Sequence, residues 1–325
     1  MSSKTFALCS IMSLSAGMSI AEAPQVAVDI APVHSLVARV MEGVGTPDLI
    51  IPAGASPHEY NLRPSEAASL QNADVVFWVS ASLTPWMKNA IETLAEDAVV
   101  TELFEVEGTL NLPFRQGVLF EEHDDNDGHD DHDGHDDHEG HDDHEAHDDH
   151  EGHNHDGDDP HAWLSPDNAA VWLNAIAQTL SKVDPDNASQ YYLNAAAGQK
   201  ELRELSTKIN GILAPFEGRN FIVFHDAFQY FEKAFDFYAA GAISLSDARD
   251  PSPARIAKIQ NRINEQNISC ILSEPQFNPN IVAAVASGSD VKMGILDPLG
   301  VGLELGETLY FQTLHNLAKA LSDCL

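Results

Sequence analysis

The chain has 325 residues, of which 51 are acidic and 17 basic, so its formal net charge is -34 with neutral histidines. This length suffices for about two domains, and the hydrophobic share of 43% excludes a chain that is disordered throughout. The negative charge disfavours nucleic acid and acidic membranes as partners, because their phosphate groups would be repelled. Cations are the partners that this charge favours.

Residues 1–21 have the pattern of an export signal. Lys4 supplies a positive start, Phe6–Ile20 is largely apolar, and the small residue Ala21 stands where a signal peptidase cuts. We expect cleavage after Ala21, because a cut two residues later would put Pro24 directly beyond the broken bond. The apolar stretch is too short to span a bilayer. The alternative is a buried N-terminal helix, but we expect an exported, soluble mature chain.

Two cysteines remain once Cys9 is removed with the signal, namely Cys270 and Cys324. An even number in an oxidising compartment favours one disulfide. Such a disulfide would tie the strand predicted around Ser269–Leu272 to the C-terminus. The alternative is a pair of buried free thiols.

Strand and helix signals alternate along the mature chain. In the first half, the pattern predicts strands at Val26–Ile30, Leu49–Ile51 and Val75–Val79, and helices at Val33–Met41, Pro64–Leu70 and Pro85–Leu94. In the second half, it predicts strands at Phe221–Phe224, Ser269–Leu272 and Val291–Ile295, and helices at Ala227–Ala234, Pro253–Asn264, Pro279–Val285 and Thr308–Leu321. This alternation predicts an α/β fold with two parallel-sheet lobes, at residues 22–183 and 216–325.

A long helix is expected between the two lobes, at residues 184–215. No proline interrupts Asp186–Leu213, and apolar residues recur there at helical spacing. A helix of this length extends over about 42 Å, which is more than one small lobe needs. We therefore expect a linker helix that runs along both lobes. The alternative is an ordinary surface helix of one lobe.

A low-complexity segment occupies residues 121–159. It holds 20 acidic residues, no basic residue and four near-copies of the hexapeptide G/A-H-D-D-H-D/E. Because it has hardly any apolar side chain to bury, we expect a disordered loop inserted in the first lobe. Its eleven histidines are His123, His129, His132, His135, His138, His141, His144, His147, His150, His153 and His155.

Imidazoles and carboxylates together are typical ligands of zinc, copper and nickel. We therefore expect the His-rich loop to capture several metal ions reversibly and with low affinity and poor selectivity. The alternative is an acidic, solubilising linker, which would not require a histidine at every third position.

Four single residues in separate segments are candidates for a more specific site: His58, His161, His225 and Asp297. Three of them lie at or just past the carboxyl ends of predicted strands, where open α/β sheets bind their ligands. A lone histidine is more often structural, so the residue pattern alone leaves this site open.

The segments around these residues resemble the metal-binding receptors of ABC uptake systems, specifically the periplasmic zinc-binding proteins of high-affinity zinc importers. The resemblance covers nearly the whole mature chain. It rests on the motifs P-H-E-Y-N-L-R-P-S, D-P-H-A-W-L-S-P, F-H-D-A-F-Q-Y-F, L-S-E-P-Q-F and L-D-P-L-G, in this order. The His-rich insertion just before His161 adds to its specificity.

The resemblance implies two α/β lobes joined by a rigid helix, with a metal cleft between them. His58 and His161 would come from the first lobe, and His225 and Asp297 from the second. Some relatives have an acidic residue just before the first histidine, where this chain has Pro57. We also expect Glu274, at a strand end, to support a ligating imidazole from behind.

Three imidazoles and one carboxylate favour tetrahedral zinc. Manganese-specific relatives resemble this pattern but use two histidines and two carboxylates, so His225 favours zinc. Copper and nickel remain competitors by affinity, and a solvent molecule is the alternative to Asp297 as fourth ligand.

The expected function is that of a periplasmic, monomeric and non-catalytic protein that captures zinc and delivers it to the membrane permease of an ABC importer. One alternative is a periplasmic zinc buffer or chaperone without a permease. Another is a zinc hydrolase, because three histidines with an open position can activate water. Against the hydrolase, the chain has no H-E-x-x-H motif, and Asp297 would close the coordination shell.

Overall fold

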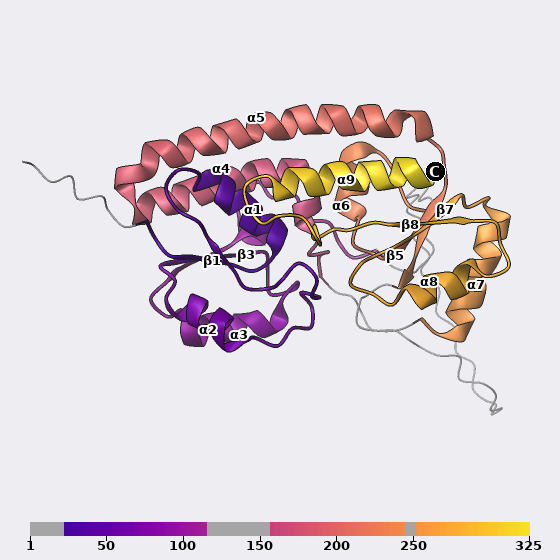
Figure 1. Cartoon of the computed structure of the whole chain (residues 1–325), viewed down its shortest axis with the longest axis horizontal. Coiled ribbons are helices and arrows are strands. Elements are labelled where there is room, and N and C mark those ends of the chain that lie inside the picture. Colours follow the sequence, from indigo (N-terminus) through magenta and orange to yellow (C-terminus); the bar gives the residue numbers. More distant parts are fainter. Residues whose placement is uncertain (1–22, 116–156, 245–250) are drawn as a thin grey trace, which may run out of the picture.

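The structure, a computed structural model, describes residues 23–115, 157–244 and 251–325 (Figure 1). The predicted signal peptide and all eleven histidines of the predicted His-rich loop lie outside the described residues. Among the residues that are described, no helix combines the length and the apolar composition needed to cross a bilayer.

The first lobe is built on a parallel sheet with the strand order β2-β1-β3-β4. Its elements are β1 (Val26–Val28), α1 (Ala31–Val40), β2 (Asp48–Leu49), α2 (Pro64–Gln71), β3 (Val75–Trp78), α3 (Pro85–Leu94), β4 (Val99–Glu102) and the 3-10 turn η1 (Leu103–Glu105). The edge strand β4 was not predicted. Strands β1 and β3 are wholly buried, as expected of parallel strands covered on both faces.

The second lobe repeats this arrangement, with the strand order β6-β5-β7-β8 and only parallel pairs among these strands. Its elements are β5 (Phe221–His225), α6 (Gln229–Phe235), β6 (Gly241–Ser244), α7 (Pro253–Glu265), β7 (Cys270–Ser273), α8 (Pro279–Ala286) and β8 (Lys292–Ile295). Strand β6 was not predicted. Two parallel-sheet α/β lobes are thus confirmed as the fold class.

A helical hairpin follows the short 3-10 turn η2 (Ala162–Leu164). It consists of α4 (Pro166–Val183), the turn η3 (Pro185–Asn187), the long α5 (Ala188–Leu213) and the turn η4 (Ala214–Phe216). Helix α5 packs on α1 and α4 of the first lobe and reaches α6 of the second, so it extends over both lobes as expected (Figure 1). Gly198 permits its close approach to α4, because a Cβ there would lie 3.0 Å from a methyl carbon of Leu173.

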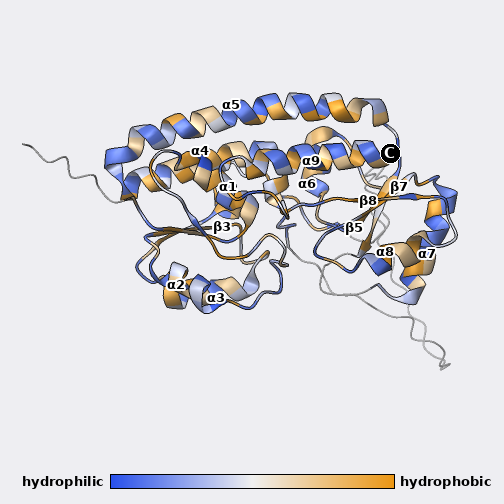
Figure 2. Ribbon diagram, in the orientation of Figure 1, coloured by the Kyte–Doolittle hydropathy of each residue, from blue (hydrophilic) through white to orange (hydrophobic). Residues whose placement is uncertain are grey.

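Helix α5 alternates hydrophilic and hydrophobic residues along its length (Figure 2). Its buried residues include Tyr191, Ala195, Leu202, Ile209 and Leu213, which recur four or seven positions apart. One face of the helix therefore packs on the lobes and the other faces water.

The C-terminal helix α9 (Leu309–Cys324) also joins the lobes, which the sequence did not predict. It lies alongside α5 and packs on both α5 and α1 (Figure 1). The backbone N–H of Tyr310 donates to Ser35 Oγ of α1 at 2.9 Å, and the Tyr310 hydroxyl donates to the carbonyl of Trp163 at 2.6 Å. The predicted second lobe, residues 216–325, therefore ends in a helix shared with the first.

The predicted disulfide between Cys270 and Cys324 is confirmed, with 5.8 Å between the two Cα atoms. It joins the first residue of β7 to the last residue of α9. The central sheet of the second lobe is thus bonded covalently to a helix that also packs on the first lobe.

Candidate metal site

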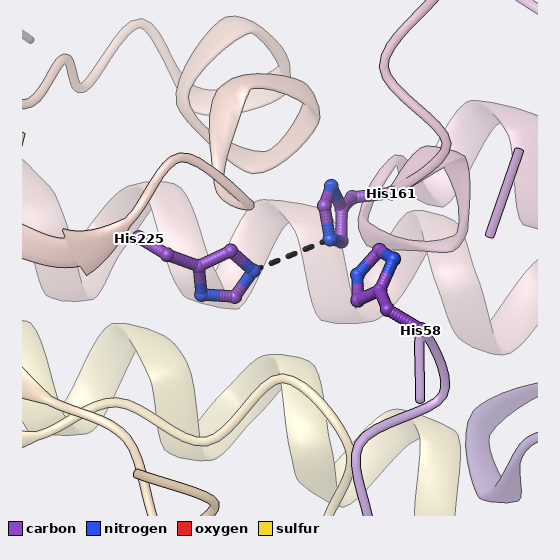
Figure 3. A group of neighbouring side chains, drawn as sticks. All are labelled: His58, His161 and His225. Carbon is purple, nitrogen blue, oxygen red and sulfur yellow. Dashed lines mark hydrogen bonds between the residues drawn. The ribbon is translucent and has the colours of Figure 1, made fainter. Parts of the chain in front are cut away.

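The structure brings together three histidines from distant segments: His58, His161 and His225 (Figure 3). His58 lies in the loop that follows β2, His161 directly precedes η2, and His225 is the last residue of β5. His225 points across from the second lobe toward the other two side chains, which come from the first lobe (Figure 3). His161 and His225 are buried, and His58 is half-buried.

The distances between these imidazoles fit a metal site. One nitrogen from each ring lies within 4.8 Å of the others, and the Nε2 atoms of His161 and His225 are 3.3 Å apart. Tetrahedral zinc with Zn–N bonds of about 2.0–2.1 Å separates its ligand atoms by about 3.3 Å. The separation of these two nitrogens is therefore already that of a tetrahedral edge.

A carboxylate stands behind His225. Glu274 Oε1 lies 2.6 Å from His225 Nδ1 and also accepts the backbone N–H of His225 at 3.3 Å. Glu274 directly follows β7, the strand that pairs with β5, so the parallel pairing places it beside His225. The structure thus locates Glu274 where a supporting residue is expected.

A second carboxylate stands behind His161, and sequence reasoning missed it. Asp159 Oδ1 lies 2.6 Å from His161 Nδ1 and accepts the backbone N–H of His161 at 3.0 Å. Asp159 is only 2% exposed, and its burial raises its pKa to about 7. In the sequence Asp159 stands at the end of the predicted acidic loop, although its position two residues before a candidate ligand is a usable signal.

These two carboxylates decide what the imidazoles can bind. An ionised carboxylate only accepts hydrogen bonds, so when both carboxylates are ionised each facing Nδ1 carries the ring proton and each Nε2 keeps a lone pair. These two Nε2 atoms are 3.3 Å apart. In this state both lone pairs can coordinate one cation, and the carboxylate–histidine pairing is the support that metal-bound imidazoles usually have.

The loop that holds His58 is fixed to α3. The indole N–H of Trp86 donates to the carbonyl of Pro57 at 2.9 Å, next to His58 in the chain. The His58 ring centre lies 5.4 Å from that of His161. The proline-containing loop between β2 and α2 therefore presents its histidine to the other two.

Asp297 lies on the loop after β8, but its carboxylate oxygens are not among the possible ligand atoms that lie within 4.8 Å of one another. Its carboxylate accepts the backbone N–H groups of Leu299, Gly300 and Val301 at 3.0, 3.0 and 2.5 Å. Burial raises the pKa of Asp297, and these three donors lower it in part. Asp297 as the fourth ligand stays a prediction, because its carboxylate here closes a turn.

The three histidines line a small cavity of about 20 Å³, which has room for one water molecule or a small ion. Both lobes form its wall, which includes Trp163, Phe277 and Leu299. Two hydrogen bonds cross between the lobes beside it. Trp163 Nε1 donates to the carbonyl of Pro298 at 3.0 Å, and Gln276 Nε2 donates to the carbonyl of Ala53 at 3.3 Å.

Comparison with known proteins identifies the family. The profile of the family described as "Zinc-uptake complex component A periplasmic" matches residues 26–324. The chain belongs to this family. By this description, members of the family are periplasmic components of zinc-uptake complexes.

Two curated members of the family are similar over nearly their whole length. The "High-affinity zinc uptake system protein ZnuA" of Brucella abortus (strain 2308) is 44% identical over 314 residues, which cover 95% of this chain and 94% of that protein. The protein of the same name from Paracoccus denitrificans (strain Pd 1222) is 45% identical over 306 residues, covering 94% and 93%.

Among solved structures, "Crystal structure of ZnuA" superposes with a TM-score of 0.72 at 20% identity, covering 93% of this chain and 99% of that one. At this identity the match supports the fold alone. The two chains thus share one fold, with two parallel-sheet lobes and a long helix.

Proposed function

We propose that this protein is the zinc-binding component of a high-affinity uptake system. It binds one zinc ion between its lobes, through His58, His161 and His225, and delivers the ion to the membrane permease of an ABC importer. The observation that carries this proposal is the pair of carboxylate-backed imidazoles, one from each lobe, whose Nε2 atoms are 3.3 Å apart. The names of the similar proteins support zinc as the ion.

Three neutral imidazoles leave zinc its full charge of two, and the fourth position completes the tetrahedron. We assign this position to Asp297, once its carboxylate turns away from the backbone donors, or to a solvent molecule. Titration of the metal-free protein with zinc against a competing chelator tests the proposal. It predicts one tight site per chain, and a protein without any tight site would contradict it.

Delivery to a permease separates this proposal from a zinc buffer without one. Loss of the protein should stop growth on limiting zinc and stop uptake through the permease encoded with it, whereas a buffer would only change zinc tolerance. For the zinc hydrolase, the small cavity speaks against a bound organic substrate, because its 20 Å³ accommodate little more than one water molecule. Esterase or phosphatase turnover by zinc-loaded protein would support the hydrolase instead.

Zinc affinity is expected to fall as the pH falls through about 6.5, the usual pKa of histidine. The imidazoles must be neutral to bind, so protons compete with zinc below this pH. Protonation of Asp159, whose pKa burial raises to about 7, removes the acceptor behind His161 in the same range. Calorimetry at pH 7.5, 6.5 and 5.5 should show this decline, and equal affinity from pH 7.5 to pH 5.5 would contradict it.

We further propose that the His-rich segment captures additional zinc ions with low affinity. Deleting residues 121–156 removes its eleven histidines and leaves Asp159 and His161 in place. The deletion should lower the number of zinc ions bound per chain while the tight site keeps its affinity. Native mass spectrometry of both forms measures the two quantities, and loss of the tight site in the deletion would show that the segment belongs to it.

A further inference from the structure

The described residues on either side of the His-rich segment form a short stem, which we define as residues 112–115 and 157–159. Its two strands lie antiparallel, with a bridge between Pro113 and Asp158. The Phe114 N–H donates to the carbonyl of Gly157 at 3.2 Å, and the Asp159 N–H donates to that of Leu112 at 2.7 Å. The stem ends at Asp159, directly behind the His161 imidazole.

The stem is fastened to the second lobe through Arg115. The Arg115 guanidinium donates to both carboxylate oxygens of Asp226, with Nε–O distances of 3.0 and 3.1 Å, and its Nη1 donates to Glu232 Oε2 at 2.7 Å. The side chains of Asp226 and Glu232 are 7% and 1% exposed. One cation from the first lobe is thus shared by two buried carboxyl groups of the second.

Further hydrogen bonds join the stem to α6 of the second lobe. The Tyr230 hydroxyl of α6 accepts the N–H of Leu112 at 2.9 Å and donates to the carbonyl of Asp159 at 2.7 Å. Gln229 Nε2 donates to the carbonyl of Pro113 at 3.0 Å. Both strands of the stem therefore lie against the start of α6.

These contacts form a continuous path from one of the two facing imidazoles to the other. Asp226 directly follows His225 in the chain, and Asp159 hydrogen-bonds His161. The two imidazoles that face each other across the lobes are thus connected by Arg115 and the stem, independently of any ion.

The chemistry of the Arg115 guanidinium and its two carboxylates suits a positioning role. A buried ion pair adds little net stability, because desolvation offsets much of the attraction, but its geometry is demanding. The planar guanidinium donates hydrogen bonds to two carboxylates in fixed directions. The ammonium group of a lysine is a compact charge that does not fix these directions. Helices α5 and α9 already join the lobes at a distance, whereas Arg115 acts next to the ligand itself.

We propose that Arg115 is a positioning residue of the zinc site, which holds His225 at coordination distance from His161 and so slows the release of zinc. This inference rests on the proposed function, because it requires zinc to bind these histidines. Arg115 does not contact the ion. Its contribution is the preformed spacing between ligands from the two lobes.

The experiment compares Arg115→Met and Arg115→Lys with the wild type in the full chain. Zinc release into excess chelator, followed by stopped flow, should be about tenfold faster in both variants, which equals the lower end of the affinity loss when a group that hydrogen-bonds a metal ligand is removed. Cobalt(II) bound in place of zinc should show altered visible absorption bands, because the bands report ligand geometry. Unchanged release together with an unchanged cobalt spectrum would overturn the inference.

Arg39 supplies the matched control. It pairs with Glu42, just after α1, and with Glu201 on α5, and its side chain is similarly buried at 10% exposure. Arg39→Met should lower stability without changing zinc release or the cobalt spectrum. Equally fast release in Arg39→Met would overturn the inference, since general loosening would then explain the effect.

Two further comparisons separate a folding defect from a changed zinc site, and failure of this inference from failure of the proposed function. If Arg115→Met fails to fold, the neutral variant Arg115→Met/Asp226→Asn/Glu232→Gln takes its place, and the same faster release is expected. Wild-type protein without a tight zinc site would overturn the proposed function together with the inference. Tight wild-type binding with wild-type release in the Arg115 variants would overturn the inference alone.

Discussion

Replacing His225 by alanine is expected to remove tight zinc binding from a protein that still folds. The imidazole is one of three that converge, and its Nδ1 is 2.6 Å from Glu274. Zinc sites with four ligands contribute about 10–16 kcal/mol in total, so the loss of one imidazole should weaken binding by a factor on the order of a hundred or more. Competition with a chelator of known affinity measures this loss.

The control for this change is His315→Ala. His315 lies on α9, outside the group of three histidines, so its replacement should leave the zinc affinity unchanged. Circular dichroism checks that both variants keep their helices. Wild-type affinity in His225→Ala would contradict the assignment of this residue, as would an equal loss in His315→Ala.

Removal of the disulfide is expected to cost about 4 kcal/mol of the free energy of unfolding. Cys270 and Cys324 are 54 positions apart, and closing so long a loop restricts the unfolded chain strongly. The bond also joins β7, which leads to Glu274, to a helix shared by both lobes. Urea denaturation of the variant Cys270→Ala/Cys324→Ala measures the effect.

The reduced wild type serves as the comparison, because it loses the bond without a change of side-chain volume apart from the added hydrogens. Its free energy of unfolding should fall by a similar amount. A loss below about 1 kcal/mol in both proteins would contradict the stabilising role of the disulfide.

Helix starts at a proline were the most predictable boundaries of the fold, because local residues determine them. Helix α7 begins at Pro253 and is capped by Ser252, whose Oγ accepts the N–H of Arg255 at 3.3 Å. Ser165 caps α4 in the same way through Asn168, at 3.2 Å. Proline at the first turn and a capping hydroxyl act within one turn of helix, so the sequence alone reveals them.

The elements that were missed depend on tertiary contacts. Strand β4 lies at a sheet edge and has only two apolar residues, Val99 and Val100, and β6 consists of the small residues and one isoleucine of Gly241–Ser244. Their pairing partners, rather than their own patterns, make them strands. The sequence also predicted the helix α9 but not that α1 would be its neighbour.

In the candidate site too, local sequence features were predictable and tertiary contacts were not. The carboxyl ends of predicted strands indicated where His58, His225 and Asp297 would lie, and family motifs indicated the role of these residues and of His161. Hydrogen-bond partners were beyond this reasoning. Asp159 stood at the end of an acidic run and was taken for part of it, and nothing in the sequence showed that the Asp297 carboxylate would turn toward backbone N–H groups.

The most direct test of the account is anomalous diffraction at the zinc edge from crystals of the zinc-loaded protein. We expect one strong anomalous peak between the lobes, about 2.0–2.1 Å from a nitrogen of each of His58, His161 and His225. A strong peak elsewhere, with the three imidazoles outside coordination distance of any ion, would contradict the account.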